Sequence, residues 1–319
     1  MIVMDLHARI MMFSSPYQSK RFAAQLEAAL QFPQLFTPRA ADSHKGTHGT
    51  LAVVGGAAGM SGAVILAATA AIYSGCGKVW AGFNQNTLPL PVVPERPEIM
   101  LATAPVLQQR DDISAWVFGC GLGLCSEAAS LLRTQLQRCG NEPLLLDADA
   151  LTLLARHPEA AAQAGRRGNV ILTPHPAEAA RLLGISTADV QADRGQAAEC
   201  ISRRFNAYTV LKGRHTSICA PNGSLLHTNR SGNPGLAAAG SGDVLSGIIG
   251  SLLAQSISPE QAICGGVWLH GAAADVLKDS ETGETGMLSG EIAPAARWLR
   301  NRITANLHPE SQARETLLP

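Results

Sequence analysis

From Leu51 onward, short aliphatic runs alternate with longer amphipathic stretches. This alternation is typical of β-α units, in which helices cover a largely parallel sheet. A hairpin with the turn Pro221-Asn222-Gly223 is expected near the end of the pattern. We therefore expect an α/β fold with a mostly parallel central sheet and helices on both faces. The expected strands are residues 51–54, 78–83, 115–119, 143–147, 169–173, 208–212, 216–220 and 224–228.

Several helix ends are marked by their residues. Ser126 and Gly140 bracket a helix expected at 127–139. Ser258, Pro259 and Gln261 together predict an N-cap, a proline at the first helical position and a capping box. The low-charge stretch 262–274 of that helix is a candidate for a surface that meets another subunit.

One domain is the simplest organisation, because no Pro/Gly/Ser-rich linker and no internal repeat divides the chain. Residues 1–44 show weak periodicity and are expected to form an N-terminal extension with one short helix near 19–30. The main domain is expected at 45–305 and a C-terminal tail at 306–319.

Composition excludes several classes of protein. Apolar residues make up 46% of the chain and charged residues 16%, which fits a packed aliphatic core rather than disorder. Lys plus Arg equal Asp plus Glu, so the chain has no sequence-wide basic field for nucleic acid, and none is expected as a partner. The seven cysteines include no Cys-x-x-Cys pair, so we expect reduced thiols, a cytoplasmic protein and no cysteine metal site.

Neither a signal peptide nor a membrane span is expected. The N-terminus lacks the basic start, long apolar middle and cleavage site of a signal peptide. Residues 50–77 carry no charge and are long enough to cross a membrane, but six glycines interrupt them. A strand, a glycine turn and an Ala-rich helix explain this stretch better.

The strongest local signal is Gly240-Ser241-Gly242-Asp243, which opens a charge-free apolar stretch at 244–254. Two glycines permit backbone angles that bring N–H groups together at a helix N-terminus, where a phosphate is favoured. Asp243 would lie beside that anion and could accept a proton from a substrate hydroxyl. The alternative is a glycine loop in which Asp243 only caps a buried helix.

Other polar residues follow predicted strands and should meet at one edge of the sheet, where open parallel sheets bind ligands. Lys212-Gly213 closes one strand, and His175 follows another between two prolines. Asp147 and Asp149 would share a face if their strand continued, and they suit metal binding or helix capping as well as catalysis. Lys212 could equally be a surface lysine and His175 a structural histidine. The glycine loop at 54–62 lacks G-x-G-x-x-G spacing, which weakens a Rossmann dehydrogenase hypothesis.

Taken together, these segments resemble the family of ADP-dependent (S)-NAD(P)H-hydrate dehydratases, which are ribokinase-like proteins with a carbohydrate kinase domain. The resemblance covers residues 45 to about 300, and its most specific parts are the D-A-D-A-L and T-P-H-x-x-E segments. The matching segments are Lys45-Gly46-Thr47-His48-Gly49, Gly55-Gly56, Ser61-Gly62-Ala63, Gly119-Cys120-Gly121-Leu122-Gly123, Asp147-Ala148-Asp149-Ala150-Leu151, Thr173-Pro174-His175 with Glu178, Lys212-Gly213 with Thr216, and Asn233-Pro234-Gly235-Leu236-Ala237 before the Gly240 motif.

The resemblance implies a ribokinase-like three-layer sandwich and an enzyme, a carbon–oxygen lyase that repairs nicotinamide cofactors. ADP, with Mg²⁺ as cofactor, would phosphorylate the hydroxyl of the S epimer of hydrated NADH or NADPH. Loss of phosphate would then regenerate the reduced cofactor and leave AMP. A homo-oligomer, specifically a tetramer, is also implied.

Site residues follow from the same resemblance, position by position, with no side chain assigned to a metal. Asp243 would be the catalytic base and would also contact the substrate. The pocket for the hydrated dinucleotide would be lined by Ala63, Gly123 and His175. The nucleotide would be held by Lys212, Gly213, Arg214, His215, Thr216, Gly240, Ser241 and Gly242.

Three segments depart from the family pattern. Cys120 stands where proline is usual, Arg96-Pro97-Glu98 replaces His-Pro-Glu, and the stretch 283–291 lacks the usual Ser-Asp. Many relatives also carry an N-terminal epimerase domain that interconverts the two hydrate epimers. Roughly 45 leading residues are too few for such a domain, so we expect a separate epimerase.

Two other functions fit parts of the pattern. A small-molecule kinase of the hydroxyethylthiazole or hydroxymethylpyrimidine type would share G-S-G-D but release a stable phosphate ester. A catalytically silent nucleotide sensor would keep the binding loops, but Asp243 beside intact glycines argues against it.

Overall fold

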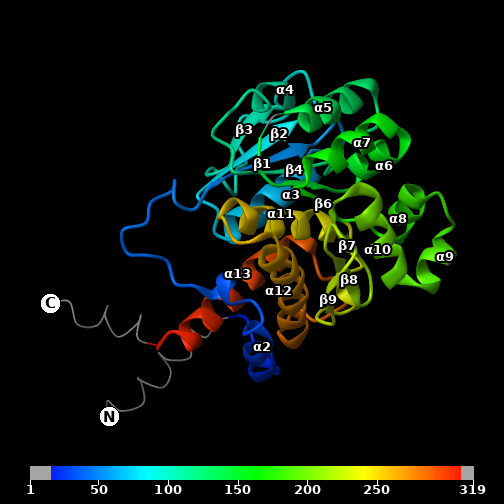
Figure 1. Ribbon diagram of the computed structural model, residues 1–319. Coiled ribbons are helices and arrows are strands. Elements are labelled where there is room, and N and C mark those ends of the chain that lie inside the picture. The colour runs from blue at the N-terminus through cyan, green and yellow to red at the C-terminus, as the bar shows by residue number, and fades with distance from the viewer. Residues whose placement is uncertain (1–15, 139, 310–319) are drawn as a thin grey trace, which may run out of the picture.

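The computed structural model describes residues 16–138 and 140–309. Within them, the centre is a nine-stranded sheet with the order β3-β2-β1-β4-β5-β6-β7-β8-β9 (Figure 1). The strands from β1 to β7 pair in parallel, and β8 runs antiparallel to both of its neighbours. Their bounds are β1 Thr50–Gly55, β2 Lys78–Phe83, β3 Met100–Thr103, β4 Ala115–Phe118, β5 Leu144–Leu146, β6 Val170–Leu172, β7 Tyr208–Leu211, β8 Thr216–Cys219 and β9 Leu225–Asn229.

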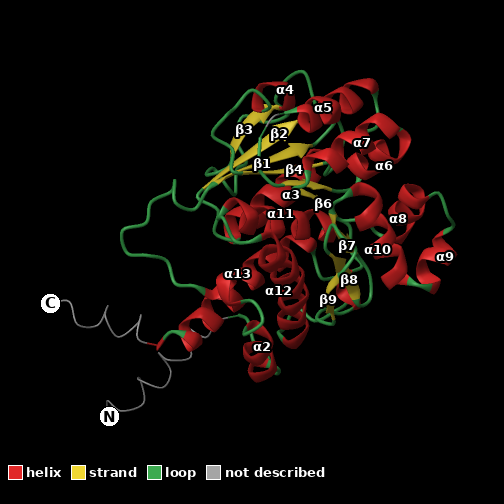
Figure 2. Ribbon diagram, viewed as in Figure 1, coloured by secondary structure: helices red, strands yellow, loops and turns green. Residues whose placement is uncertain are grey.

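Helices cover both faces of this sheet, so the predicted three-layer α/β arrangement is confirmed (Figure 2). One face carries α2 Phe22–Ala29, η1 Pro33–Phe36, α3 Ser61–Tyr73, α11 Ser241–Ala254, α12 Pro259–Asp279 and α13 Ser289–Leu307. The other face carries α4 Ala104–Leu107, α5 Ser126–Gln137, α6 Asp149–Arg156, α7 Pro158–Arg167, α8 Pro176–Leu183, α9 Thr187–Ala192 and α10 Arg194–Phe205. A short helix, η2 Pro234–Leu236, precedes α11.

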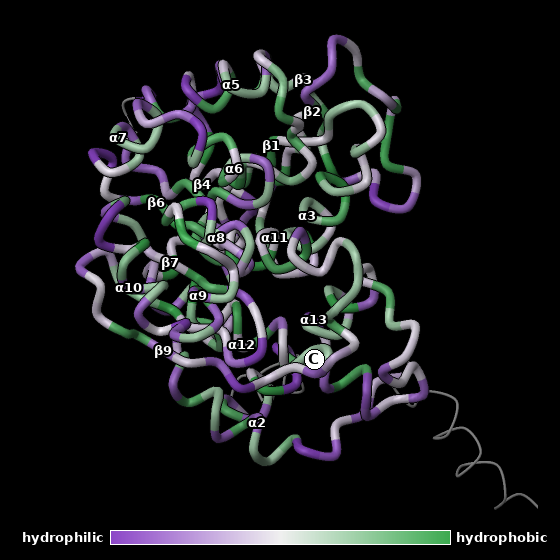
Figure 3. Tube along the Cα trace, turned by 90° about the vertical axis from the view of Figure 1, so that its right-hand side faces the viewer, coloured by the Kyte–Doolittle hydropathy of each residue, from purple (hydrophilic) through white to green (hydrophobic). Residues whose placement is uncertain are grey.

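Strand β1 shows why the aliphatic runs are continuous. Successive side chains of a strand point to opposite faces, and here Val53 packs in the core on one face while Val54 packs in the core on the other. A parallel strand covered on both sides therefore has no polar face. Hydrophobic segments accordingly concentrate in the strands and inner helices, and hydrophilic ones lie toward the outside (Figure 3).

The eight predicted strands and the hairpin turn are confirmed, with shifts of about a residue at their ends. Strand β3 was not expected from the sequence. It pairs only with β2 at the edge of the sheet and is half-buried, so it needs no strong aliphatic run. The helix expected near 19–30 is α2.

Helix-end predictions were less accurate. The N-cap of α5 is Cys125, and the hydroxyl of Ser126 donates to Glu127 rather than capping the helix. Helix α5 ends at Gln137, so Gly140 does not terminate it, and Cys139 lies outside the described residues. Pro259 does occupy the first turn of α12, but the expected capping box is wrong because Gln261 donates to the carbonyl of Gln31.

The expectation of a surface at 262–274 is also wrong. Ala262 and Ala274 are fully buried, and the intervening residues of α12 pack against α11, α13 and η1. The low charge of this helix reflects burial within its own chain, so it offers no surface to another subunit.

The described part of the N-terminal segment packs on the main body. Phe32, Leu35 and Phe36 are buried in the core beside α12 and α13. The boundaries at residues 44 and 305 remain predictions, and residues 1–15 and 310–319 lie outside the described residues. No helix within the described ranges is long and apolar enough to cross a membrane.

Candidate active site

The polar residues that follow β5, β6 and β7 meet the start of α11 at the carboxyl edge of the sheet. Asp147 is at the centre of this group and is almost fully buried. Its Oδ1 accepts hydrogen bonds from Lys212 Nζ at 2.6 Å and from the Ala148 amide at 2.9 Å. Its Oδ2 accepts one from Ser246 Oγ at 2.7 Å. One carboxylate thus ties the end of β5 to the end of β7 and to α11.

Asp147 and Asp149 would share a face only if their strand continued, and it does not. Strand β5 ends at Leu146, and Ala148 adopts a positive φ of 48°. The chain turns there, so Asp149 becomes the first residue of α6 and accepts the Gly123 amide at 2.8 Å. The two carboxylates therefore fix different loops.

The start of α11 has the geometry of an anion site. Gly240 is the N-cap with φ 88°, a left-handed conformation that favours glycine. Ser241 and Val244 amides donate to main-chain carbonyls, whereas no hydrogen bond within the described residues engages the amides of Gly242 and Asp243. Free amides at a helix N-terminus favour a negatively charged ligand.

The Lys212 ammonium lies at this same helix start. A Cβ built on Gly242 would be 3.4 Å from Lys212 Nζ, so a larger residue there would crowd the ammonium. Burial lowers the pKa of Lys212, but the Asp147 and Glu178 carboxylates outweigh burial and leave that pKa raised. Lys212 therefore stays charged beside the free amides, rather than lying on the surface.

Asp243 is partly buried, and its carboxyl titrates near neutrality. Burial raises its pKa to about 6, and the neighbouring Asp147 charge adds to the rise. A hydrogen bond from the Cys120 thiol and the charge of Lys212 act in the opposite direction. Such a carboxylate is ionised at pH 7 but basic enough to accept a proton, which suits general-base catalysis.

Two glycine loops form the neighbouring wall. The Gly56 amide donates to the Cys120 carbonyl at 2.9 Å, and any Cβ at Gly55 would overlap that carbonyl. A Cβ on Gly121 would lie 3.2 Å from the Cβ of Ala63. The loop before α3 and the Gly119–Gly123 loop therefore pack backbone to backbone, which brings Ala63 and Gly123 to the same edge as Asp243.

His175 caps α8 and is half-exposed. Its Nδ1 accepts the Ala177 amide at 3.1 Å, and its own amide donates to Glu178 Oε2 at 2.8 Å. Burial raises the pKa of Glu178 to about 7, whereas burial and Lys212 lower the pKa of His175. His175 thus has the structural role that the sequence left open, while its imidazole remains accessible near Lys212.

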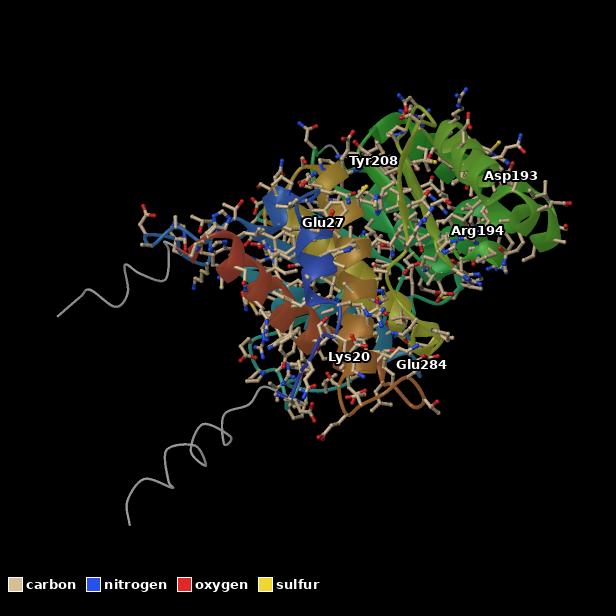
Figure 4. The ribbon with its side chains drawn as sticks, turned by 90° about the horizontal axis from the view of Figure 1, so that it is seen from below. Lys20, Glu27, Asp193, Arg194, Tyr208 and Glu284 are labelled. Atoms are coloured by element: carbon tan, nitrogen blue, oxygen red, sulfur yellow. The ribbon has the colours of Figure 1, made fainter. Side chains whose placement is uncertain are left out.

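The loop after β7 has an inner and an outer part. Lys212 points inward, Arg214 and His215 are exposed, and Thr216 Oγ1 donates to the Gly213 carbonyl at 3.0 Å. Arg194, at the start of α10, holds this loop through bonds to the carbonyls of Leu211 and Lys212 (Figure 4).

The structure brings the predicted site residues to one edge, and it adds three residues to which the sequence had assigned no role in the site. Ser246 and Cys120 contact the central carboxylates, and Arg194 braces the loop after β7. Ser246 had a signal, since a serine one helical turn after Asp243 in an apolar helix faces the same side. Arg194 had none, because its partners are main-chain carbonyls far along the chain.

This arrangement matches one known family. A family model described as NAD(P)H-hydrate dehydratase matches residues 51–296. The chain belongs to the NAD(P)H-hydrate dehydratase family. The ADP-dependent (S)-NAD(P)H-hydrate dehydratase of Neisseria meningitidis serogroup B is 59% identical over 282 residues, which are 88% of this chain and 95% of that protein. A bifunctional NAD(P)H-hydrate repair enzyme of Escherichia coli is 38% identical over 92% of this chain but only 54% of its own length.

Solved structures of the dehydratase family and its neighbours share the fold. The ADP/ATP-dependent NAD(P)H-hydrate dehydratase from Bacillus subtilis, co-crystallised with ATP/Mg²⁺, superposes with a TM-score of 0.73 at 32% identity and covers 83% of this chain and 94% of that one. A ribokinase-like superfamily protein from Enterococcus faecalis V583 gives a TM-score of 0.74 at 27% identity over 85% of this chain and 94% of that one. The expected ribokinase-like fold and family are therefore confirmed.

Proposed function

We propose that this chain uses ADP to dehydrate the S epimer of hydrated NADH or NADPH, and that it releases the reduced cofactor, AMP and phosphate. The main support for the proposal is that a basic carboxylate and an anion site lie side by side at the start of α11. Asp243 is a carboxylate with its pKa raised to about 6, and it adjoins free amides and the Lys212 ammonium. A base and an anion site side by side suit phosphorylation of a hydroxyl group. The 59% identity to a dehydratase of the same name supports this reaction over a kinase that stops at the ester.

In the first step, Asp243 would take the proton from the substrate hydroxyl as its oxygen attacks the β-phosphorus of ADP. The bond from that phosphorus to the bridging oxygen breaks, and AMP leaves with the electron pair. In the second step, the lone pair of the ring nitrogen expels inorganic phosphate from the adjacent carbon. Loss of a proton from the next ring carbon then restores the double bond of NAD(P)H.

The anion site would stabilise charge on the transferred phosphoryl group. We assign this role to the Gly242 and Asp243 amides, with Gly240 and Ser241 shaping the turn, and to Lys212. Gly213, Arg214, His215 and Thr216 would contact the remainder of the nucleotide. Ala63, Gly123 and His175 would line the site of the hydrated dinucleotide, where small side chains permit close approach.

Mg²⁺ fits this site as a companion of the nucleotide. The described residues contain no group of three or more His, Cys, Asp or Glu side chains placed to hold a metal ion. Mg²⁺ commonly keeps several waters and binds through substrate phosphates and one or two carboxylates. Glu178 and Asp149 lie at this edge and could provide such a carboxylate. When bound, the ion would neutralise developing charge on the phosphates.

Several partners and properties belong to the same proposal. A separate epimerase would convert the other hydrate epimer into the S form that this chain consumes. The reduced cysteines favour a cytoplasmic location. A tetramer is a prediction that light scattering on the purified protein would test.

The test is incubation with the S epimer of hydrated NADH or NADPH and either ADP or ATP. The reduced-nicotinamide absorbance should recover, with AMP and free phosphate formed in equal amounts when ADP is used. A kinase acting on a thiazole or pyrimidine alcohol would instead accumulate a stable phosphate ester. Accumulation of a phosphorylated product without gain of reduced nicotinamide would disprove the dehydratase proposal.

A further inference from the structure

A pocket of about 910 Å³ lies at the opposite edge of the sheet from Asp243. Its walls come from the loop that precedes β1, the end of α3 and one side of α13. That loop, residues 37–49, runs outside the main body before it enters the sheet (Figure 1). The carbonyls of His48 and Gly49 accept the amides of Gly77 and Lys78, where β2 begins. The pocket is therefore at the amino-terminal edge of the strands, away from the candidate active site.

The charged side chains that line this pocket are mostly cationic. It includes Arg39, Arg297 and Arg300 together with the imidazoles of His44 and His48, and Asp42 is its single acidic residue. None of the three arginines forms an ion pair with a carboxylate in the described part of the chain. Among the described residues, no carboxylate therefore pairs with the three guanidinium groups gathered here.

Two of the guanidinium groups are held close together. Arg300 donates from Nε to the Leu35 carbonyl and from Nη1 to the Ser74 carbonyl, both at 2.7 Å. Arg39 donates from Nη2 to the Gly75 carbonyl. A Cβ on Gly75 would lie 2.9 Å from Arg39 Nη2 and 3.6 Å from Arg300 Nη1, which shows how near the two cations are.

These hydrogen bonds to carbonyls explain where the two arginine side chains lie, but they leave some of the guanidinium N–H groups without an acceptor in the ranges that the structure describes. The last carbonyls of α3 lack helical partners, and cations near a helix C-terminus are favourable. Carbonyls carry only partial charge, however, and no hydrogen bond among the described residues engages Arg300 Nη2 or Arg39 Nη1. Two guanidinium forks thus retain donors for an oxyanion.

The histidines at the rim point to the same deficit of negative charge. His48 Nε2 is buried and has no hydrogen-bond partner within residues 16–138 and 140–309. Burial lowers the pKa of His48, and Arg39, Arg300 and His44 lower it further. Burial and Arg39 also lower the pKa of Arg300 to about 10. Buried polar groups normally find a partner, so an anion between these cations would supply one.

We propose that this pocket binds a small phosphate-bearing metabolite, with its phosphate between Arg39 and Arg300. The site is separate from the one that holds ADP, and it uses residues around the Lys45-Gly46-Thr47-His48-Gly49 motif that the proposed reaction does not require. The inference does not depend on the role of Asp243.

Inorganic pyrophosphate is the probe, added without Mg²⁺ and measured by isothermal titration calorimetry. Wild type should bind it at two places, because the start of α11 also accepts anions. Arg39→Gln should weaken pyrophosphate binding at one of the two places about tenfold, which is the usual effect of losing a charge-assisted hydrogen bond. The same variant should leave dehydratase activity unchanged. Lys212→Met should weaken binding only at the other place. Arg203→Gln, which removes an exposed arginine paired with Glu199, is the matched control and should change neither.

Location is checked with crystals soaked in selenate, whose anomalous signal marks the anion. Occupancy between Arg39 and Arg300, lost in Arg39→Gln and retained in Arg203→Gln, supports the site. Arg300→Lys keeps the charge but removes the fork, and it should also weaken binding if the variant folds. Equal pyrophosphate affinity in wild type and Arg39→Gln would overturn the proposal. The proposal would also be overturned if Arg39→Gln changed the oligomeric state without changing anion binding, because a second copy of the chain would then fill the pocket.

Discussion

Replacing Asp147 by asparagine tests whether the carboxylate at the centre of the site controls the charge of Lys212. Asp147 makes the 2.6 Å contact to Lys212 Nζ and raises the pKa of that ammonium against the effect of burial. Asparagine has almost the same shape but no charge. In Asp147→Asn, Glu178 is the remaining carboxylate that opposes burial, so the pKa of Lys212 should fall below its wild-type value.

The magnitude follows from the burial of the pair. Removing one partner of a buried ion pair costs about 3–5 kcal/mol, because the remaining charge is left uncompensated. A domain has only ~5–15 kcal/mol of stability in total, so Asp147→Asn should be measurably less stable but can still fold. Lys212 contributes stability while it is protonated, and that contribution is lost as pH rises through its folded pKa. The stability deficit of Asp147→Asn should therefore be largest while Lys212 is protonated, and it should shrink as pH rises through the lowered pKa of Lys212 in the variant.

The assay is the pH dependence of kcat/KM for dehydration, alongside urea unfolding at the same pH values. Because the pKa of Lys212 is raised in wild type, its activity should show no alkaline limb from Lys212 below the ordinary lysine range. Asp147→Asn should gain an alkaline limb at lower pH than wild type, with a kcat reduced about 10²-fold or more. Ser246→Ala is the matched control. It removes one hydrogen bond to the same carboxylate, costs about 1–3 kcal/mol, and leaves the ion pair and the alkaline limb unchanged. A folded Asp147→Asn protein with wild-type kcat and no new limb would refute the reasoning.

Three further predictions concern Asp243. Asp243→Asn should lower kcat by about 10²–10⁴-fold with nearly unchanged ADP affinity, as measured by calorimetry, and more than a tenth of wild-type activity would contradict its role as base. At pH 7.5 the same variant should unfold at a higher temperature than wild type, because a carboxyl with a raised folded pKa costs stability when it is ionised. This gain over wild type should vanish as pH falls through about 6 toward 4, where the Asp243 carboxyl is protonated. In wild type, kcat/KM should fall below pH about 6, where Asp243 becomes protonated. Cys120→Ala should move that acid limb to higher pH, because it removes a hydrogen bond that lowers the pKa of Asp243. Cys219→Ala, which changes a buried cysteine far from the site, should leave the limb where it is.

The sequence predicted the parts of this molecule that depend on local pattern. Buried parallel strands require continuous aliphatic runs, so β1, β4 and β6 were recognisable, and the Gly240 motif indicated a helix start from its glycines alone. Edge strand β3 was missed because it is only four residues long and pairs on one side alone, so its short apolar run resembles the start of the helix that follows it. The helix caps at Ser126 and Gln261 were wrong because both side chains have other partners nearby in space.

The network around Asp147 was beyond the sequence for a different reason. Its three partners lie on β7, on α11 and in the turn to α6, and only the folded sheet brings these elements together. Sequence placed Asp147 and Lys212 at one edge, but it could not show that they contact each other. The turn at Ala148, whose positive φ breaks the strand, was equally hidden, because alanine rarely adopts that conformation.

The carboxylates of Asp147 and Asp243 differ in what surrounds them, and the difference accounts for their chemistry. Asp147 has a lysine, a serine and an amide as donors, so its charge is committed to holding Lys212 and α11. Asp243 has the weak thiol donor of Cys120 and the repulsion of Asp147, so its proton affinity rises. A single fixed ammonium cannot satisfy both carboxylates, and the one that it contacts directly leaves the other free to act as a base. The ion pair of Asp147 and Lys212 thus leaves Asp243, which is not part of it, able to act as the catalytic base.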